Sequence, residues 1–539
     1  MTERGLRGVV VSAGVGVGPA FVLSEPVTAP GGGGGPDAAL AALARVAAEL
    51  ARTEERLTAQ GLNAEAEILA SNRLMAEDPS LLQEVEALAA RMPAPEALRA
   101  ATERHAAGLA ALDDELLSAR AADVRELGRR AVRALSGGSA VEAPVRPSVV
   151  VARELGPAEL LDLRLEEGLV LGIALAEGSA TSHAAIIARS LGVPMVAALG
   201  DDVLTAAVGD EVIVDGTNGL AVLRPSPETL SRTRAAAEQE AVERERLAAG
   251  RGQPTVTASG RSIRLLANAS SRAEVVGALR RGAEGVGLVR TELAFLGSAA
   301  WPSEDEHYEA LSPVLALLQG RVATVRTLDF GADKTPPFLA GSGGRGIALM
   351  LEHEDALTAQ LAAIMRAGEG TQLRIMLPLV ESPPQLVAAR RLLRRAAASG
   401  GHPLPQLGAM IETPVGATRS SELALAADFF SIGTNDLVAT TLGLDRADPL
   451  ASPLSAADPA VVALIRRTVR SAHAVGITVE ICGEAAGEPE LTPLLVGLGV
   501  DELSVSPARL DAIRDAVRRS GEAGDEARQL GYGLGGVVA

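Results

Sequence analysis

Hydrophobic and polar positions follow a helical period over the first part of the chain. Between residues 37 and 135, apolar residues recur at spacings of three and four, as in "DAALAALARVAAELARTEERL". This is the spacing of one face of an amphipathic helix. Proline-containing segments at 78–79 and 93–95 interrupt the pattern. We therefore expect about four helices that pack on one another in this segment.

Shorter apolar runs that are typical of strands flank the helical segment on both sides. Residues 8–23, "GVVVSAGVGVGPAFVL", predict a strand, a turn and a second strand. Five further runs follow the helices: "SVVVAREL", "LVLGIALA", "PMVAAL", "DEVIVDG" and "LAVLRP". These runs predict one α/β domain of residues 1–23 and 145–224, into which a helical domain of residues 24–144 is inserted. The charged and polar residues 225–254 predict a linker helix.

Eight strand-like runs then alternate with helical stretches over residues 255–539. The runs are "IRLLANA", "GVGLVRTE", "RVATVRTLD", "LRIMLPLV", "LGAMIET", "DFFSIGTND", "TVEICGEA" and "ELSVSP". Eight β/α units over a segment of this length are typical of a (β/α)8 TIM barrel. The pattern of the whole chain therefore predicts a multidomain α/β protein with an inserted helical bundle and a C-terminal barrel.

Composition and charge narrow the class of protein. The 539 residues carry a formal net charge of -18, which argues against nucleic-acid binding and is compatible with a basic protein partner. The single cysteine excludes an internal disulfide and fits a reducing compartment. The first apolar run is interrupted by glycines and a proline and makes a poor signal peptide, and no stretch predicts a transmembrane helix. We therefore expect a cytoplasmic protein without direct membrane insertion.

Polar residues gather at the C-terminal ends of the expected barrel strands, the face at which TIM barrels carry their active sites. These residues are Arg290, Arg326, Glu412, Asn435, Asp436 and Cys482. Loops at the same face add Lys334 in "DFGADK", Arg345 in "GGRGIAL", and Arg446. Arginine binds phosphate and carboxylate through two parallel hydrogen bonds, so this rim predicts a site for a small anion. The alternative is a set of structural salt bridges around the rim.

Glu412 and Asp436 follow two neighbouring strands of the expected barrel. Two carboxylates together with phosphate oxygens and water suit Mg²⁺ better than Zn²⁺. We therefore expect these two residues to hold Mg²⁺ beside the anion.

Cys482 lies in "EICGEA", at the mouth end of the seventh expected strand. A lone cysteine is often no more than a small buried hydrophobic residue. At a barrel mouth, a thiol can also donate a proton to a carbanion or enolate. The residue pattern leaves both interpretations open.

His183 lies in "GSATSHAAIIARSLGVP", where a turn rich in Gly, Ser and Thr precedes an amphipathic helix. Thr181 and Ser182 are candidate caps for this helix. The free amides and the positive dipole at a helix N-terminus disfavour imidazolium and stabilise a bound phosphoryl group. We therefore expect a neutral, nucleophilic ring that can be phosphorylated. The alternative is a structural histidine beside a capped helix.

Several motifs, in the same order over nearly the whole chain, resemble the phosphoenolpyruvate (PEP)-utilising enzymes. The histidine motif is similar to their phosphohistidine signature, and the barrel blocks are "GAEGVGLVRTEL", "VRTLDFGADK", "IETPVGA", "DFFSIGTNDL", "LGLDR" and "ICGEAAG". The helical stretch "LDDELLSARAADVRELGRR" resembles the carrier-binding region of the enzyme I family, the PEP-protein phosphotransferases of the bacterial sugar phosphotransferase system.

This resemblance implies a role for each matching residue. His183 would be the transiently phosphorylated nucleophile, and Cys482 would protonate the enolate at C3. Glu412 and Asp436 would bind Mg²⁺. The residues that would hold PEP are Arg290, Arg326, Arg345, Asn435 and Arg446, with Lys334 in the same cationic rim. The resemblance also implies a swivelling histidine domain, a helical insertion that docks the histidine phosphocarrier protein HPr, and a homodimer formed through the barrel.

The chain departs from the family pattern at three places. Ser179 stands where the family usually has a second glycine before the histidine. "ELGPA" places Gly156 where the family often has the threonine of D-L-T-P-S. The block around Arg345 is shortened, and Ala348 replaces its usual second arginine.

Two alternative functions follow from the same motifs. A PEP synthase or pyruvate,phosphate dikinase would need an ATP-binding domain, for which residues 24–144 are too few and too helical. A regulatory paralogue that binds PEP or a carrier, but turns over poorly, would account for the departures at Gly156 and Arg345.

Overall fold

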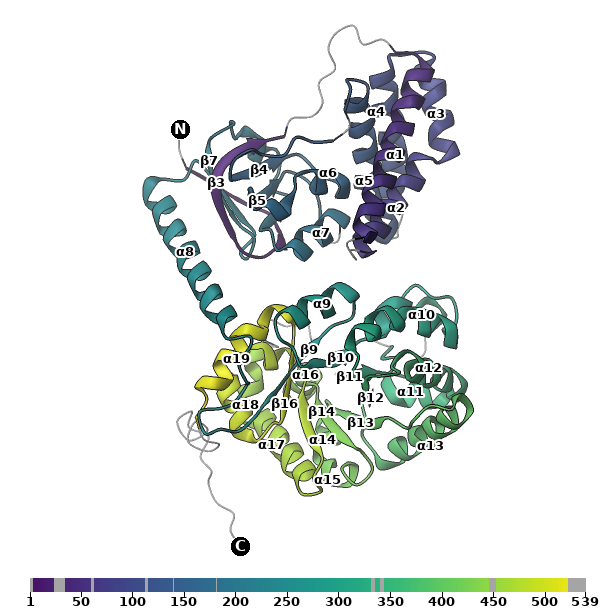
Figure 1. The fold of residues 1–539 in the computed structure, drawn as a ribbon, viewed down its shortest axis with the longest axis vertical. Helices are drawn as coiled ribbons and strands as arrows, with labels where there is room; N and C mark the ends of the chain where they lie inside the picture. The colour runs from purple at the N-terminus through teal and green to yellow at the C-terminus, as the bar shows by residue number, and fades with distance from the viewer. Residues whose placement is uncertain are drawn as a thin grey trace. The chain divides into compact units, whose positions relative to one another are not determined.

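The computed structural model describes residues 3–23, 34–59, 63–111, 115–138, 140–180, 182–330, 335–339, 344–444 and 452–521. The chain divides into two compact units, Met1–Val242 and Glu243–Ala539 (Figure 1). The first unit contains an open sheet and a helical bundle, and the second contains the barrel.

One sheet organises the first unit, and within the described residues it has eight strands in the order β1-β8-β7-β3-β4-β5-β6-β2. The strands are β1 (Arg4–Arg7), β2 (Val9–Ser12), β3 (Val15–Val22), β4 (Ser148–Ala152), β5 (Val170–Leu175), β6 (Met195–Ala197), β7 (Glu211–Asp215) and β8 (Leu220–Leu223). β3 pairs in parallel with β4, with Ala20 opposite Val149. The helical bundle is therefore inserted between two adjacent strands, which confirms the expected insertion. The sequence pattern does not predict β1, because Leu6 is its one hydrophobic residue.

Five helices form the described part of the insertion, one more than the pattern predicts. They are α1 (Pro36–Ala59), α2 (Asn63–Ala76), α3 (Pro79–Ala89), α4 (Ala94–Ala110) and α5 (Glu115–Ala134). Leu43, Leu98 and Leu127 are fully buried in their shared core. The prolines lie at helix starts, and Asp78 caps α3 by accepting the amide hydrogen of Ser80 at 2.7 Å.

Three more helices complete the connections of the first unit. α6 (Pro157–Asp162) and α7 (His183–Leu191) follow β4 and β5 in the chain. α8 (Pro227–Ala249) leads into the second unit, and none of its side chains is buried. Its polar composition is that of a connecting helix exposed to solvent, as expected from the sequence.

Eight parallel strands close the barrel of the second unit, in the order β10-β11-β12-β13-β14-β15-β16-β9. They are β9 (Arg264–Asn268), β10 (Gly285–Val289), β11 (Val322–Arg326), β12 (Gln372–Leu377), β13 (Gln406–Ile411), β14 (Phe429–Ile432), β15 (Thr478–Ile481) and β16 (Glu502–Val505). β16 pairs with β9 and closes the ring. The expected TIM barrel is confirmed, and each strand coincides with one of the eight apolar runs, β12 and β13 beginning one residue before their runs.

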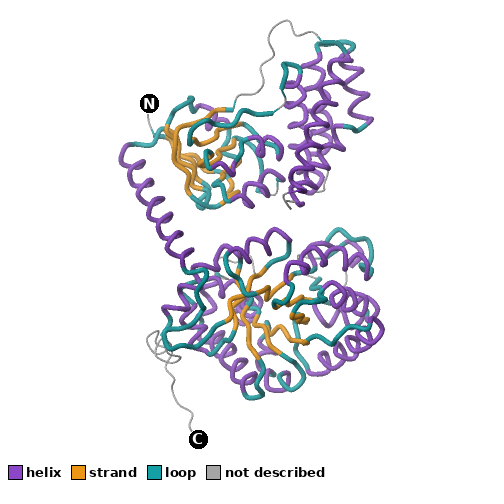
Figure 2. Tube along the Cα trace, in the orientation of Figure 1, coloured by secondary structure: helices purple, strands orange, loops and turns teal. Residues whose placement is uncertain are grey.

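Helices surround the strands of the barrel, which occupy the middle of this unit (Figure 2). They are α9 (Arg272–Arg280), α10 (Glu304–Leu315), α11 (Gly346–Glu352), α12 (Glu354–Ala367), α13 (Pro383–Gly400), α14 (Pro414–Thr418), α15 (Ser420–Leu423), α16 (Thr434–Leu442), α17 (Pro459–His473), α18 (Thr492–Leu498) and α19 (Leu510–Arg519). None of the helices in the described ranges combines the length and the apolar character needed to cross a bilayer.

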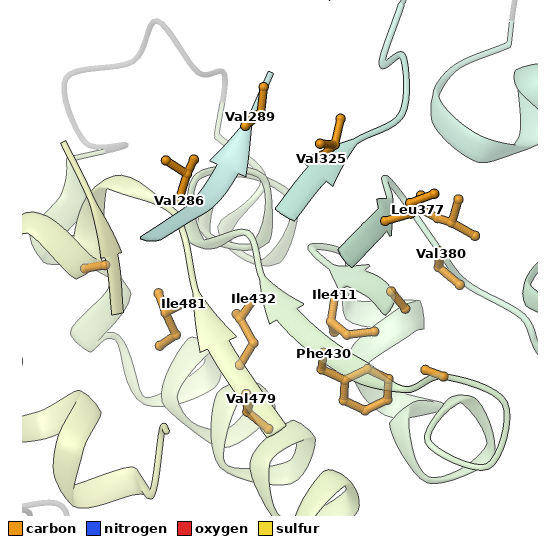
Figure 3. Close-up of a cluster of buried hydrophobic side chains, with 14 of the residues drawn as sticks. Val286, Val289, Val325, Leu377, Val380, Ile411, Phe430, Ile432, Val479 and Ile481 are labelled. Carbon is orange, nitrogen blue, oxygen red and sulfur yellow. The ribbon is translucent and has the colours of Figure 1, made fainter. Parts of the chain in front are cut away.

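The main barrel core contains alternate residues of neighbouring strands (Figure 3). Phe430 and Ile432 of β14, and Val479 and Ile481 of β15, are buried in this hydrophobic cluster. Successive side chains of a strand point to opposite faces. Residues between these positions therefore point into the barrel, where they can carry polar groups toward its mouth.

Candidate active site

His183 is the first residue of α7, at the helix end whose backbone amides have no partner within the helix. Ser182 caps this helix by accepting the amide hydrogen of Ala185 at 3.2 Å. The Ser182 hydroxyl also donates to the carbonyl of Ser179 at 3.1 Å, which tightens the preceding turn. The other candidate cap, Thr181, lies outside the described residues.

Asp123, on α5 of the insertion, faces the imidazole ring of His183. Its Oδ2 lies 2.9 Å from Nδ1, and the exposed fractions of the two side chains are 2% and 17%. A carboxylate at this distance accepts a hydrogen bond from Nδ1–H, so the lone pair of a neutral ring lies on Nε2. Nε2 is therefore the nucleophilic atom of His183.

The sequence interpretation of the ring, which rests on the helix N-terminus alone, is incomplete. The Asp123 carboxylate adds a fixed hydrogen-bond partner for Nδ1, which the helix N-terminus alone does not provide. Asp123 lies 60 positions before the histidine. The sequence feature that could have identified Asp123 is its position in the helical motif "SARAADVRELGRR", which resembles a carrier-binding region.

Glu126, one helical turn beyond Asp123, caps a helix of the α/β domain. Its Oε1 accepts the amide hydrogen of Glu159, the third residue of α6, at 2.6 Å. The usual acceptor would be the side chain at the start of the helix, but that residue is Gly156. A Cβ on Gly156 would lie 2.2 Å from the Glu126 Cδ. Glu126 therefore accounts for the glycine at position 156. It occupies the space that a side chain at 156 would need, and it accepts the amide hydrogen of Glu159 in place of that side chain.

Charged groups of both domains surround this buried contact. Burial raises the pKa of Glu126, and Glu159 raises it further. Burial also tends to raise the pKa of Glu159, but Arg129 and Arg133 outweigh burial and lower that pKa below its ordinary value. Arg129 Nη2 lies 2.7 Å from Glu159 Oε2. The network ties α5 to α6 and thereby holds Asp123 beside His183.

The close packing of Gly156 on Glu126 predicts a double-mutant result. Gly156→Ala should destabilise the first unit by about 2 kcal/mol through overpacking, and Glu126→Ala by about 1–3 kcal/mol through the lost cap. The double variant should lose on the order of 1–2 kcal/mol less than the sum, because truncation of Glu126 makes room for the new methyl group. Calorimetric unfolding of the four proteins measures this coupling. Strictly additive losses would contradict the steric account.

A cavity of about 290 Å³ lies at the C-terminal ends of the barrel strands. The predicted site residues that line it are Arg290, Arg326, Glu412, Asn435, Asp436 and Cys482. Each follows or ends a different strand, apart from Asn435 and Asp436, which share the first turn of α16. Lys334 and Arg446 lie outside the described residues.

Two carboxylates that the sequence analysis missed hold the arginines of this rim. Arg326 Nη2 donates to Glu292 Oε1 at 2.6 Å, and Nη1 lies 3.3 Å from Asp329 Oδ2. Burial would lower the pKa of Arg326, but Glu292 and Asp329 outweigh it and raise that pKa above its ordinary value. Both acids belong to barrel motifs, "GLVRTEL" and "VRTLDFGADK", whose arginines and lysine are candidate site residues.

Arg345, which lies in the shortened block, bridges two of the mouth carboxylates. Its Nη2 donates to Asp329 Oδ2 at 3.3 Å and to Asp436 Oδ2 at 3.2 Å. The guanidinium is part-buried, with 29% of the side chain exposed. Arg345 therefore contacts two residues that line the mouth cavity, even though its block is short.

The carboxylates at the mouth are crowded in a way that fits a divalent cation. Burial raises the pKa of Glu412, and Asp329 and Asp436 raise it further against the opposing effect of Arg326. Asp329 Oδ1 is buried without a hydrogen-bond partner in the described structure. No three His, Cys, Asp or Glu side chains of the described ranges form a complete metal site. A cation held by Glu412 and Asp436 would therefore need phosphate and water oxygens, as Mg²⁺ commonly does.

Cys482 lies against the inner end of the cavity. It is 3% exposed and packs with Leu288, Met376, Met410 and Phe429. Burial raises the pKa of the Cys482 thiol to about 12, with Glu480 adding to the effect. The sulfur therefore carries its proton at neutral pH, which is the state of a proton donor.

Family comparison agrees with the arrangement of these parts. The PEP-binding domain of PEP-utilising enzymes matches residues 244–521, which include the barrel and its mouth. Their mobile domain matches residues 144–219, which include His183, and their N-terminal domain matches residues 7–120. The chain belongs to the family of PEP-utilising enzymes. The relationship expected from the motifs is therefore confirmed.

Among the relatives of this PEP-utilising enzyme are two kinds of protein. A multiphosphoryl transfer protein of Xanthomonas campestris pv. campestris is 40% identical over 78% of this chain and 51% of its own length. PEP-protein phosphotransferases of Geobacillus stearothermophilus and Bacillus sp. (strain S) are 34% and 35% identical. These matches cover 96% and 94% of this chain, and 93% and 91% of the relatives. The chain thus spans about half the length of the first relative and most of the other two.

Proposed function

We propose that this PEP-utilising enzyme transfers the phosphoryl group of PEP to His183 and then to the carrier protein HPr, releasing pyruvate. The observation that carries the proposal is the His183 ring, which Asp123 holds by Nδ1 at a helix N-terminus. This arrangement presents the Nε2 lone pair to the phosphorus atom, and the helix amides stabilise the product phosphoryl group.

In this proposal PEP binds at the barrel mouth. Arg326 and Arg345 bind its phosphate and carboxylate oxygens, and Arg290 and Asn435 line the same cavity. The family resemblance adds Arg446 and Lys334 to this set. Positioning and charge neutralisation are the main requirements of phosphoryl transfer. Direct transfer also requires that His183 meets the bound donor during the cycle.

Glu412 and Asp436 would hold Mg²⁺ in this site. Bound there, Mg²⁺ would neutralise phosphate charge and orient the group for transfer. Burial, Asp329 and Asp436 together raise the pKa of Glu412 to about 8 against the effect of Arg326, and the positive charge of a bound cation would favour the ionised carboxylate.

Departure of the phosphoryl group leaves the enolate of pyruvate, and Cys482 would donate its thiol proton to C3. The C3–H bond forms as the S–H bond breaks, and the thiolate remains in the enzyme. The high thiol pKa keeps the donor protonated before the step. Proton donation favours transfer in the direction of pyruvate, because the ketone is more stable than the enol.

The carrier and the second subunit are further parts of the proposal. A hollow of about 480 Å³ on the insertion has an apolar floor that includes Met75 and Leu81, and its polar lining residues are Asp78, Glu84, Arg104 and His105. Such a surface suits a carrier with a partly apolar face surrounded by charged groups. By family resemblance we also propose a homodimer formed through the barrel and a cytoplasmic location.

Labelling with PEP tests the proposal directly. The full chain, incubated with radiolabelled PEP and Mg²⁺, should acquire one acid-labile, base-stable phosphoryl group per chain. Mass spectrometry should locate it on His183. Tight PEP binding without labelling would instead indicate the regulatory paralogue.

A further inference from the structure

A line of polar side chains lies inside the barrel directly below Cys482. Glu480 is two residues before the cysteine on β15, and Ser431 is on the neighbouring strand β14, opposite Glu480 in the strand register. The Ser431 hydroxyl donates to Glu480 Oε1 at 3.2 Å, and it lies near enough to the Cys482 thiol to lower the pKa of that thiol. The thiol itself donates to the carbonyl oxygen of Ile432 at 3.9 Å. Ser431 therefore lies beside both the carboxyl group and the sulfur.

Glu480 is fully buried and has no cationic partner in direct contact within the described residues. Its Oε2 has no hydrogen-bond partner there. Gly287 of β10 makes room for this oxygen, because a Cβ at that position would lie 2.7 Å from Oε2. A buried, unpaired carboxyl group is costly as an anion. Burial and the neighbouring Glu502 raise the pKa of Glu480 well above its ordinary value, which favours the protonated carboxyl group.

We propose that Glu480 and Ser431 form a proton relay that reprotonates the Cys482 thiolate after each turnover. The inference rests on the proposed function of the mouth cavity, because the thiolate arises there when Cys482 protonates the enolate. Ser431 gives its hydroxyl proton to the sulfur and takes the carboxyl proton of Glu480. One S–H bond forms, one carboxyl O–H bond breaks, and the serine hydroxyl is regenerated. The serine can fill this place because a hydroxyl both donates and accepts.

The charged groups that face Glu480 explain how it regains a proton from water. Glu502 of β16 pairs with Glu480 in the strand register, and Arg374 Nη1 donates to Glu502 Oε2 at 2.6 Å. Arg264 binds the same carboxylate from β9. Arg264 and Arg374 also line a cavity of about 600 Å³ at the N-terminal ends of the strands. Arg264 and Arg374 both bind the Glu502 carboxyl group, and Glu502 raises the pKa of Glu480 and so favours the return of a proton to it.

Isotope exchange between PEP and pyruvate tests the relay without a carrier protein. The full chain is incubated in D₂O with PEP, carbon-labelled pyruvate and Mg²⁺. Carbon exchange reports phosphoryl transfer together with proton transfer at C3. Deuterium that appears in PEP reports the delivery of solvent protons to Cys482. In the unmodified protein both labels should enter PEP together.

Glu480→Gln should lower the ratio of deuterium entry to carbon exchange by about tenfold or more, because Cys482 then recycles its own proton. Ser431→Ala should lower the same ratio. Ser504→Ala is the matched control: the Ser504 hydroxyl is also buried beside Gly287, but it donates to Asn268 Oδ1 at 2.7 Å and not to Glu480. In this variant the ratio of deuterium entry to carbon exchange should equal that of the unmodified protein.

Each outcome is informative about the relay. The ratio is independent of the amount of folded enzyme, so partial loss of stability does not imitate the effect. Equal losses of both labels in the Glu480 and Ser431 variants, or an unchanged ratio in both, would overturn the relay. Absence of carbon exchange in the unmodified protein would instead overturn the proposed function.

Discussion

Replacing His183 with glutamine should abolish the covalent transfer of phosphate from PEP to the chain. Glutamine can retain a hydrogen bond to Asp123, whose Oδ2 lies 2.9 Å from the histidine Nδ1. It has no nucleophilic ring nitrogen to replace Nε2, so phosphoryl incorporation should fall by at least about 10⁴-fold. The measurement is the initial rate of labelling with radioactive PEP and Mg²⁺.

Binding of PEP should survive this substitution. The residues that line the mouth cavity all belong to the second unit, so calorimetric affinity for PEP with Mg²⁺ should change by less than about twofold. The matched control is His473→Gln, because His473 Nε2 lies 2.9 Å from Asp501 Oδ2 in a similar His–Asp pair. The control should label fully. Labelling of the His183 variant at the normal rate would refute the assignment of the nucleophile.

Replacing Arg326 with lysine should reduce the efficiency of labelling by about 100-fold or more. The buried guanidinium bonds Glu292 at 2.6 Å and faces Asp329 at 3.3 Å. An ammonium group keeps the charge but cannot form two parallel bonds in fixed directions. Loss of one charged hydrogen bond to substrate, together with an imperfectly paired buried acid, costs about 3 kcal/mol. The rate of His183 labelling as a function of PEP concentration gives the change in kcat/KM.

Arg390→Lys is the control for this loss. Arg390 also pairs with one carboxylate, Asp428, at 3.0 Å, but it lies on α13 and does not line the mouth cavity. Its labelling efficiency should stay within about twofold of the unmodified protein. A similar loss in both variants would point to general destabilisation of the barrel rather than to a role of Arg326 at the mouth.

Local pattern sufficed to predict the positions of the mouth residues. Each barrel strand coincides with an apolar run, and polar residues such as Glu412 and Cys482 directly follow the last strand residue. Parallel strands bring their carboxyl ends to one face. Polar residues at the strand ends therefore line one cavity once the strands close into a barrel. The roles proposed for these residues remain predictions until they are measured.

The same pattern could not predict the partners of those residues. Asp329 and Glu292 become neighbours of Arg326 only through loops whose course depends on packing. Asp123 meets His183 because two domains dock through Glu126 and Gly156. In the sequence, Glu480 is one polar residue within an apolar run. Its position below Cys482 depends on which face of β15 points into the barrel.

By itself, the sequence determined most of the helices and strands of this protein and their order along the chain, because the spacing of apolar residues is a local property that each segment carries. It also determined the family, through motifs that stay together in the chain. Only the tertiary structure decided which carboxylate orients His183, why glycine stands at 156, and what lies beneath Cys482. These contacts join residues far apart in the chain, and their distances arise only when separately folded layers pack against each other.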